Sequence, residues 1–144
     1  MRSKKELKVK KLTDTARTPE KAHQGDLGYD VFADEDKWIP YGEYRLISTG
    51  ISVLNNTYKY GFLIKDRSSI AMKGLFTHAG VIDAGYTGEI KVFFHNVSNT
   101  SIKIEKGDKI AQLVPTKVIN FEVEEVEELF QTKRGDNGFG STGK

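Results

Sequence analysis

Cysteine is absent from this chain of 144 residues, and histidine is scarce. The absence of cysteine excludes disulfide bridges, thiolate catalysis and cysteine-ligated zinc. The three histidines lie at unrelated spacings in the sequence, namely at His23, His78 and His95. A metal site built from sulfur or from clustered imidazole rings is therefore not expected.

Long apolar runs and a strong charge of one sign are also missing. No apolar run approaches the roughly 18 residues that a membrane-spanning helix needs, so we expect no membrane partner. The N-terminal sequence MRSKKELKVKK is charged, and no apolar stretch follows it, which argues against a secretory signal. The formal net charge of +2 is too small to predict a nucleic-acid partner. Together these features predict a single cytoplasmic domain.

Glycine is plentiful, and the 14 glycines separate short runs that are rich in β-branched and aromatic residues. Short strands between turn residues are typical of an all-β sandwich or barrel. Helices of ten or more residues, which a parallel α/β fold needs between its strands, are not predicted. The expected strands cover residues 7–12, 44–53, 60–64, 90–94, 102–104 and 110–118.

Two segments are less regular. Residues 68–75 are the best candidate for a helix, of about two turns. Residues 118–130 fit both a strand and a helical stripe, and we favour the strand. Residues 131–144 contain four glycines and almost no apolar side chain. We therefore predict one β domain over residues 1–130 and a flexible C-terminal arm over residues 131–144.

A first candidate site is the sequence Asp66-Arg67-Ser68-Ser69. An arginine and two hydroxyl groups at the start of a short helix could hold a phosphate. The plainer interpretation is that Asp66 or Ser68 caps the helix.

A second candidate lies in residues 80–88, where two apolar residues lead into Asp83 and a Gly-Tyr turn. This pattern predicts a hairpin that continues into a strand over residues 89–94. Asp83 is a candidate general base, and Tyr86 a candidate wall against a flat ligand. A turn aspartate that bonds only to its own backbone is the alternative.

Three further segments carry weaker signals. Asp30 follows Gly28 and Tyr29 and could hold Mg²⁺ through water, because Mg²⁺ favours oxygen ligands and keeps several of its waters; a plain turn aspartate is the alternative. Gln112 is a polar residue within an apolar run and is a candidate site residue. A strand position that faces solvent would explain it without a function. Residues 134–143 combine arginine, one aromatic ring, hydroxyl groups and glycines, which suits a segment that folds over a nucleotide.

The order of these five segments resembles the five motifs of the trimeric dUTP pyrophosphatase (dUTPase) family. The matching segments are 27–30, 66–69, 80–88, 107–114 and 134–143. One departure is Asp66, where many members carry glycine or proline. The resemblance implies an all-β, jelly-roll-like barrel that assembles as a homotrimer with three shared active sites and mobile C-terminal arms.

The resemblance also implies an activity, the hydrolysis of dUTP to dUMP and pyrophosphate with Mg²⁺ as cofactor. That activity would keep uracil out of DNA and supply dUMP for dTMP synthesis. Asp83 would activate the water that attacks the α-phosphorus. Tyr86 would pack under the deoxyribose and exclude a 2′-hydroxyl group. The segment over residues 80–91 would read uracil, with contacts from Gly80, Val81, Ile82 and Lys91.

The remaining roles concern the triphosphate and the arm. Asp30 would touch Mg²⁺ through water, while the triphosphate itself holds the ion. Phe139 would stack on uracil. The residues expected to hold phosphates are Arg67, Ser68, Ser69 and Gln112, and those expected to contact the substrate from the arm are Arg134, Gly140, Ser141 and Thr142.

Three other interpretations remain. The related dCTP deaminases share the fold, but they need a glutamate on the strand after the turn, near Phe93, where this chain has no carboxylate. A non-catalytic nucleotide sensor would be favoured by an insert or a damaged third motif, and neither is visible. A purely structural β domain would leave five ordered motifs without a role.

Overall fold

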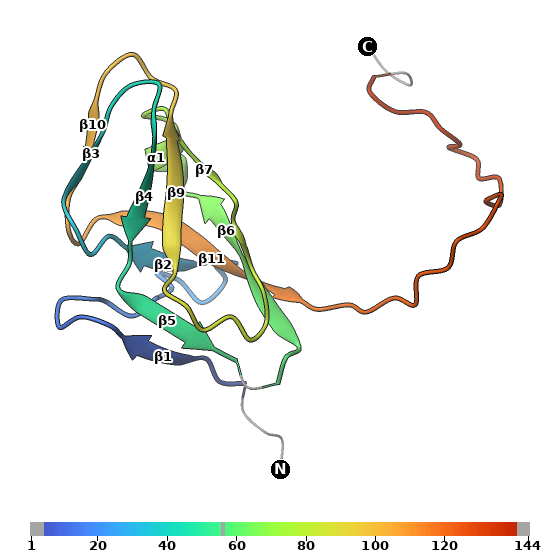
Figure 1. Cartoon of the computed structure of the whole chain (residues 1–144), viewed down its shortest axis with the longest axis horizontal. Helices are drawn as coiled ribbons and strands as arrows, with labels where there is room; N and C mark the ends of the chain where they lie inside the picture. Colours follow the sequence, from blue (N-terminus) through green and yellow to red (C-terminus); the bar gives the residue numbers. More distant parts are fainter. Residues whose placement is uncertain (1–4, 56, 141–144) are drawn as a thin grey trace.

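The computed structural model describes residues 5–55 and 57–140. Within those ranges, no helix is both long enough and apolar enough to cross a membrane. Strands dominate the described part of the chain, where one short helix lies after the sixth strand (Figure 1). The elements in chain order are β1 (Lys8–Lys11), β2 (Tyr29–Phe32), β3 (Lys37–Ile39), β4 (Tyr44–Ser48), β5 (Ile51–Leu54), β6 (Tyr60–Asp66), α1 (Ser68–Ala71), β7 (Leu75–His78), β8 (Val81–Ile82), β9 (Lys91–Asn96), β10 (Ile102–Ile104) and β11 (Lys109–Lys117).

Two larger sheets form the body of the domain. One has four strands in the order β2-β11-β6-β8, and the other has three in the order β4-β9-β7. Two strand pairs, β1-β5 and β10-β3, complete the fold. Every pairing is antiparallel. This architecture confirms the prediction of an all-β, jelly-roll-like fold.

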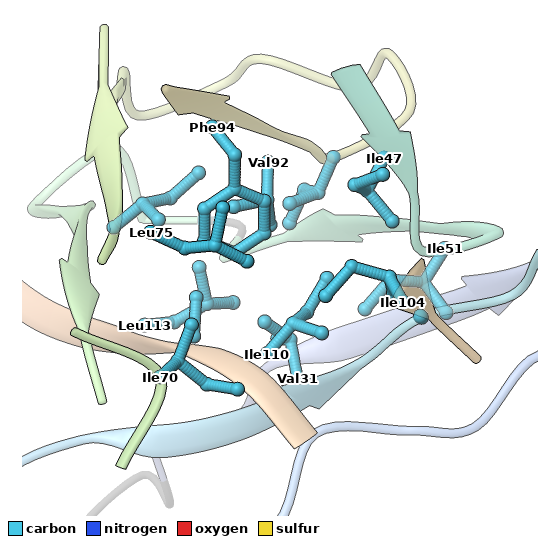
Figure 2. Packing of buried hydrophobic residues seen from close by; sticks show 14 of the residues in the cluster. Val31, Ile47, Ile51, Ile70, Leu75, Val92, Phe94, Ile104, Ile110 and Leu113 are labelled. Atoms are coloured by element: carbon cyan, nitrogen blue, oxygen red, sulfur yellow. The ribbon is translucent and has the colours of Figure 1, made fainter. Parts of the chain in front are cut away.

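The core lies between the two larger sheets (Figure 2). Ile47, Val92 and Phe94 project from the three-stranded sheet toward Val31 and Leu113 of the four-stranded sheet, and all five are almost inaccessible to solvent. On β9 the buried residues alternate with more exposed ones, as expected for a strand with one face on the core. Burial of apolar area at roughly 25 cal/mol per Å² makes this layer the main stabilising contribution.

The predicted strands are confirmed with small changes at their ends. The run over residues 44–53 divides into β4 and β5 at Gly50, whose φ is +70°. A Cβ at this glycine would lie 2.9 Å from the Cβ of Ala16 and 2.6 Å from a carboxylate oxygen of Asp34. Glycine is required here because the chain turns between two elements with no room for a side chain.

Two predictions about local structure are wrong. The helix α1 covers only one turn, and Leu75, expected at its end, instead begins β7. Residues 118–130 form neither a strand nor a helix, although Phe121 and Val123 alternate with polar residues. The last strand ends at Lys117, and the chain then leaves the barrel as an extension (Figure 1). The proposed boundary between domain and arm at residue 130 stays a prediction.

Asp34, which follows β2, is hydrogen-bonded to the segment that precedes this strand. Its carboxylate accepts hydrogen bonds from the hydroxyl groups of Thr13, at 2.5 Å, and Thr15, at 2.7 Å. Burial raises the pKa of Asp34, but these two hydrogen bonds and the charges of Lys106 and Lys11 outweigh it, so the pKa lies below its ordinary value. The charged carboxylate is therefore the form that the folded state prefers.

We expect Asp34→Asn to lower the melting temperature at pH 7 but not near pH 2. Because the pKa of Asp34 is lower in the folded state than in the unfolded state, the charged carboxylate stabilises the fold. This stabilisation is complete above the pKa of the unfolded state and is lost as the pH falls through the pKa of the folded state. The variant imitates the protonated residue, so its deficit should shrink below about pH 4, the ordinary aspartate range. Thermal melts of both proteins across this range measure the difference. A deficit that is constant with pH would contradict the assignment.

Candidate active site

The Asp83 carboxylate lies on the wall of a pocket of about 550 Å³. The side chain is exposed, and among residues 5–55 and 57–140 no hydrogen bond or ion pair engages it. Its own carbonyl accepts a hydrogen bond from the N–H of Tyr86 at 3.1 Å, which closes the turn. The turn thus uses the backbone of Asp83 and leaves the carboxylate available to a ligand. The residues that line the pocket are Leu46, Ala79, Val81, Ile82, Asp83, Tyr86, Glu89 and Lys91.

The hairpin expected around Asp83 does not form as predicted. The strand before the turn, β8, pairs with β6 of the four-stranded sheet. The strand after it, β9, begins at Lys91 and pairs with β4 and β7 of the other sheet. The chain therefore leaves the three-stranded sheet after β7, at Ala79 with a φ of +52°, and returns to it over residues 83–90. Both sheets line the pocket, through Leu46 of β4 and through Val81 and Ile82 of β8.

Tyr86 is held across the loop that follows Asp83. Its hydroxyl donates a hydrogen bond to the carbonyl of Glu89 at 3.0 Å. The ring lies so close to Gly88 that a Cβ there would be 2.6 Å from the ring carbon Cζ. Gly88 thus provides the space in which this ring forms one wall of the pocket.

A second cluster lies at the opposite end of the four-stranded sheet and contains residues from β2, from β11 and from the position directly after β6. The carboxylate of Asp30, on β2, faces Arg67 Nε at 3.3 Å and Lys109 Nζ at 3.6 Å. Arg67 also donates from Nη1 to the carbonyl of Lys109 at 3.2 Å. Asp30 is only 16% exposed and belongs to a strand, so the interpretation as a plain turn residue is wrong.

Gln112 lies beside this cluster on β11. Its amide nitrogen donates to the carbonyl of Asp66 at 3.0 Å, and its side chain packs directly against Gly28. A Cβ on Gly28 would lie 2.9 Å from the Cβ of Gln112, so a larger residue would displace the amide. The side chain is half-buried rather than solvent-facing, which corrects the plain strand interpretation.

The two serines after Arg67 begin the short helix. Ser68 and Ser69 are exposed, and the capping position is Arg67, with no side-chain hydrogen bond to the helix. The interpretation of Asp66 or Ser68 as the helix cap is therefore wrong. The Asp66 carboxylate instead accepts a hydrogen bond from the N–H of Thr77 at 2.8 Å.

The arm residues lie apart from both the pocket beside Asp83 and the cluster around Asp30. Phe139 is fully exposed, and Arg134 donates from Nε to the carbonyl of Asn137 at 3.0 Å within the extension itself. Gly140 has a φ of +84°. Ser141 and Thr142 lie outside the described residues.

Strand β6 sets the distance between the pocket beside Asp83 and the second cluster around Asp30. The backbone of Asp83 lies beside Gly61 at the start of that strand, and Arg67 follows its last residue. At about 3.3 Å per residue, six residues of strand separate the two ends by about 20 Å. In one chain, Arg67 and Asp83 are therefore too far apart to contact the same phosphate group.

Two charged residues were missed in the sequence. Lys109 pairs with Asp30, and Glu89 lines the pocket while its carboxylate accepts the N–H of Gly50 at 3.0 Å. Lys109 lies in the segment 107–114 that was singled out, but a lysine after a Gly-Asp turn carries no signal of its partner. Contacts between residues this distant in the chain become visible only in the fold.

A model of the family described as dUTPase matches residues 14–143. The chain belongs to the dUTPase family. Curated relatives named Deoxyuridine 5'-triphosphate nucleotidohydrolase are similar to this chain over nearly its full length. The relative from Clostridium acetobutylicum is 44% identical over 140 residues, covering 95% of this chain and 96% of the relative. The relative from Gloeothece citriformis is 45% identical over 142 residues, covering 95% and 96%.

Solved structures of dUTPases share the fold. The dUTPase of Staphylococcus bacteriophage 80alpha, solved with dUPNHPP, has a TM-score of 0.89 and 32% identity, covering 96% of this chain and 99% of that one. A mutant dUTPase from phage phi11 of S. aureus, solved with a structural Mg(II) ion, has a TM-score of 0.80 and 29% identity. It covers 88% of this chain and 99% of its own.

We expect Asp30→Asn to destabilise the protein, because Arg67 and Lys109 would lose their shared counter-charge. A partly buried charged group left without its partner costs about 1–3 kcal/mol. The matched control is Glu43→Gln, which breaks the 3.2 Å pair with Arg45 at an exposed site and should cost about 1 kcal/mol or less. Urea unfolding of both variants measures the two costs. Equal costs would show that the cluster does not depend on Asp30.

Proposed function

We propose that the chain hydrolyses dUTP to dUMP and pyrophosphate, and that it thereby keeps uracil out of DNA and supplies dUMP for dTMP synthesis. Membership of the dUTPase family over residues 14–143 and the names of the relatives support this activity. The observation that carries it is the Asp83 carboxylate, unengaged within the described chain, on a pocket whose other wall is Tyr86.

Asp83 is the proposed general base. Its carboxylate takes a proton from a water molecule as the water oxygen forms a bond to the α-phosphorus. The bond from that phosphorus to the oxygen that bridges to the β-phosphate breaks, and pyrophosphate leaves with the bonding pair. General-base catalysis contributes about 10²–10⁴-fold, so the groups that stabilise the phosphate charge must supply much of the remaining acceleration.

Uracil recognition is proposed for the backbone of β8. This strand lies at the edge of its sheet, with β6 as its single partner among the described strands. An edge strand presents N–H and C=O groups that a flat base with its own donor and acceptors can use. Val81 and Ile82 of β8 provide these groups, together with the preceding Gly80, whose carbonyl already accepts the N–H of Ile64. Lys91 lies on the same pocket, and Tyr86 packs under the deoxyribose where a 2′-hydroxyl group would need space.

Phosphate binding is proposed for the second cluster, through Arg67, Ser68, Ser69 and Gln112. Arginine and hydroxyl donors suit phosphate oxygens. The Asp30 carboxylate and the carbonyl of Lys109 orient the guanidinium group of Arg67 before any substrate arrives. Such preorganised donors lose little energy to rearrangement when charge develops in the reaction.

Mg²⁺ is the proposed cofactor, held mainly by the triphosphate. Among the described residues, no three His, Asp or Glu side chains come together as a metal site, and both oxygens of Asp30 face cations. These residues fit an ion that keeps its waters and touches Asp30 through one of them, as Mg²⁺ commonly does. When bound, Mg²⁺ neutralises part of the phosphate charge.

A homotrimer with shared active sites is the proposed assembly. The roughly 20 Å along β6 between Arg67 and Asp83 supports a site whose phosphate donors and base come from different copies. The extension after β11 supports this assembly, because its exposed apolar side chains need a surface to cover them. These side chains are Ile119, Phe121, Val123, Leu129 and Phe130, with exposed fractions of 67%, 82%, 93%, 86% and 100%.

We expect Asp83→Asn to retain binding of dUTP and to lose most of its turnover. The amide keeps the shape of the side chain but cannot accept the proton, so kcat should fall by about 10²-fold or more. Steady-state pyrophosphate release gives kcat, and calorimetric titration with dUpNHpp gives binding. Turnover within a few-fold of the parent would exclude Asp83 as the base.

A mixture of two inactive variants tests the shared site. We expect trimers co-expressed from Asp83→Asn and Arg67→Ala chains to regain about a quarter of the parent activity, because random mixing gives that fraction of sites one intact residue from each copy. A site contained in one chain would regain none. Light scattering of the parent should show a trimer, and a monomer would contradict the assembly.

The arm is proposed to close over bound nucleotide, with Phe139 stacking on uracil and Arg134, Gly140, Ser141 and Thr142 at the phosphates. We expect deletion of residues 135–144 to remove most activity while the melting temperature stays unchanged, because none of residues 135–140 is buried in the core. Phe139→Ala should reproduce much of the defect, and Phe139→Trp should not, since stacking contributes about 1–3 kcal/mol per base. A deletion variant with full activity would show that the arm is not needed for the reaction.

A further inference from the structure

Asp66 connects the two sheets at a point where their strands do not pair. Along one side of β6, strand β8 pairs with Phe62 and Leu63, and the N–H of Ile64 donates to the carbonyl of Gly80 at 2.6 Å, so Lys65 and Asp66 have no strand partner there among the described residues. The Asp66 carboxylate fills this position by accepting the N–H of Thr77, on β7 of the other sheet, at 2.8 Å. The bond is partly buried, so water competes with it less than at an exposed site.

The backbone around Asp66 carries the proposed phosphate donors. The carbonyl of Asp66 accepts the amide of Gln112 at 3.0 Å, and the next residue is Arg67. Arg67 is in turn held by Asp30 and by the carbonyl of Lys109. Movement of the Asp66 backbone would therefore shift both donors, one through a hydrogen bond and the other through the chain itself.

We propose that Asp66 is a positioning residue for phosphate recognition: through its hydrogen bond to Thr77, it fixes the backbone from which Arg67 and Gln112 reach the triphosphate. This inference rests on the proposed function. Only an acceptor oxygen on a short side chain is required of Asp66, because the partner is a neutral backbone N–H. Asparagine fulfils that requirement, whereas alanine leaves the N–H of Thr77 without its partner.

The experiment compares Asp66→Ala and Asp66→Asn with the parent, and uses Asp36→Ala as the matched control. Asp36 also accepts one backbone N–H through its carboxylate, from Lys106 at 2.8 Å, but contacts neither Arg67 nor Gln112. The measurements are kcat and KM for dUTP, the affinities for dUpNHpp and for deoxyuridine, and the melting temperature.

For Asp66→Ala we expect kcat/KM and dUpNHpp affinity to fall roughly tenfold or more, because displaced donors misplace the reacting phosphate. The affinity for deoxyuridine, which carries no phosphate, should stay within about twofold, since the pocket beside Asp83 is intact. Asp66→Asn should restore kcat/KM to within a few-fold of the parent. Asp36→Ala should change the melting temperature without this split between the two ligands.

Three results would overturn the inference: an Asp66→Ala variant with parental kcat/KM, one that loses dUpNHpp and deoxyuridine affinity equally, or an Asp66→Asn variant as defective as the alanine. The equal loss would mean that Asp66 supports the fold in general. A parent chain that fails to hydrolyse dUTP would instead refute the proposed function. The two failures are therefore distinguishable.

Discussion

Strand β6 is the element on which the functional surface depends. It pairs with β11 along its whole length of seven residues and with β8 at one end only. The backbone of Asp83 lies beside its first half, and Arg67 follows its last residue. Because a strand rises by a fixed distance per residue, these pairings set the separation of the two candidate centres at about 20 Å.

That separation changes what a single copy can do. The pocket beside Asp83 offers a carboxylate, the ring of Tyr86 and the edge of β8, whereas the other end of the sheet offers the proposed phosphate donors. Neither group alone has the chemistry to bind and cleave a nucleoside triphosphate. The proposed trimer resolves this by joining one end of a sheet in one copy to the other end in the next, and the exposed extension after Lys117 supplies further surface for contact.

The charges of the second cluster are balanced within the chain. Asp30 neutralises part of the positive charge of Arg67 and Lys109, so two cations can lie close together without a ligand. A triphosphate is far more negative than one carboxylate and would compete for the same guanidinium group. The donors of the cluster are oriented by contacts with the backbone, as the proposed binding of phosphate requires.

The sequence by itself was sufficient to predict the fold class, because the alternation of apolar and polar residues and the position of turn residues can be read locally, without knowledge of tertiary contacts. It also carried the order of the motifs, which led to the family. The prediction from sequence failed where contacts between distant residues decide the structure. Residues 118–130, for which a strand was favoured, have no strand partner within the described chain, and β8 pairs with β6 rather than with the strand after Asp83. Only the tertiary structure placed Lys109 beside Asp30 and the carboxylate of Asp66 on Thr77, because such contacts depend on strand register.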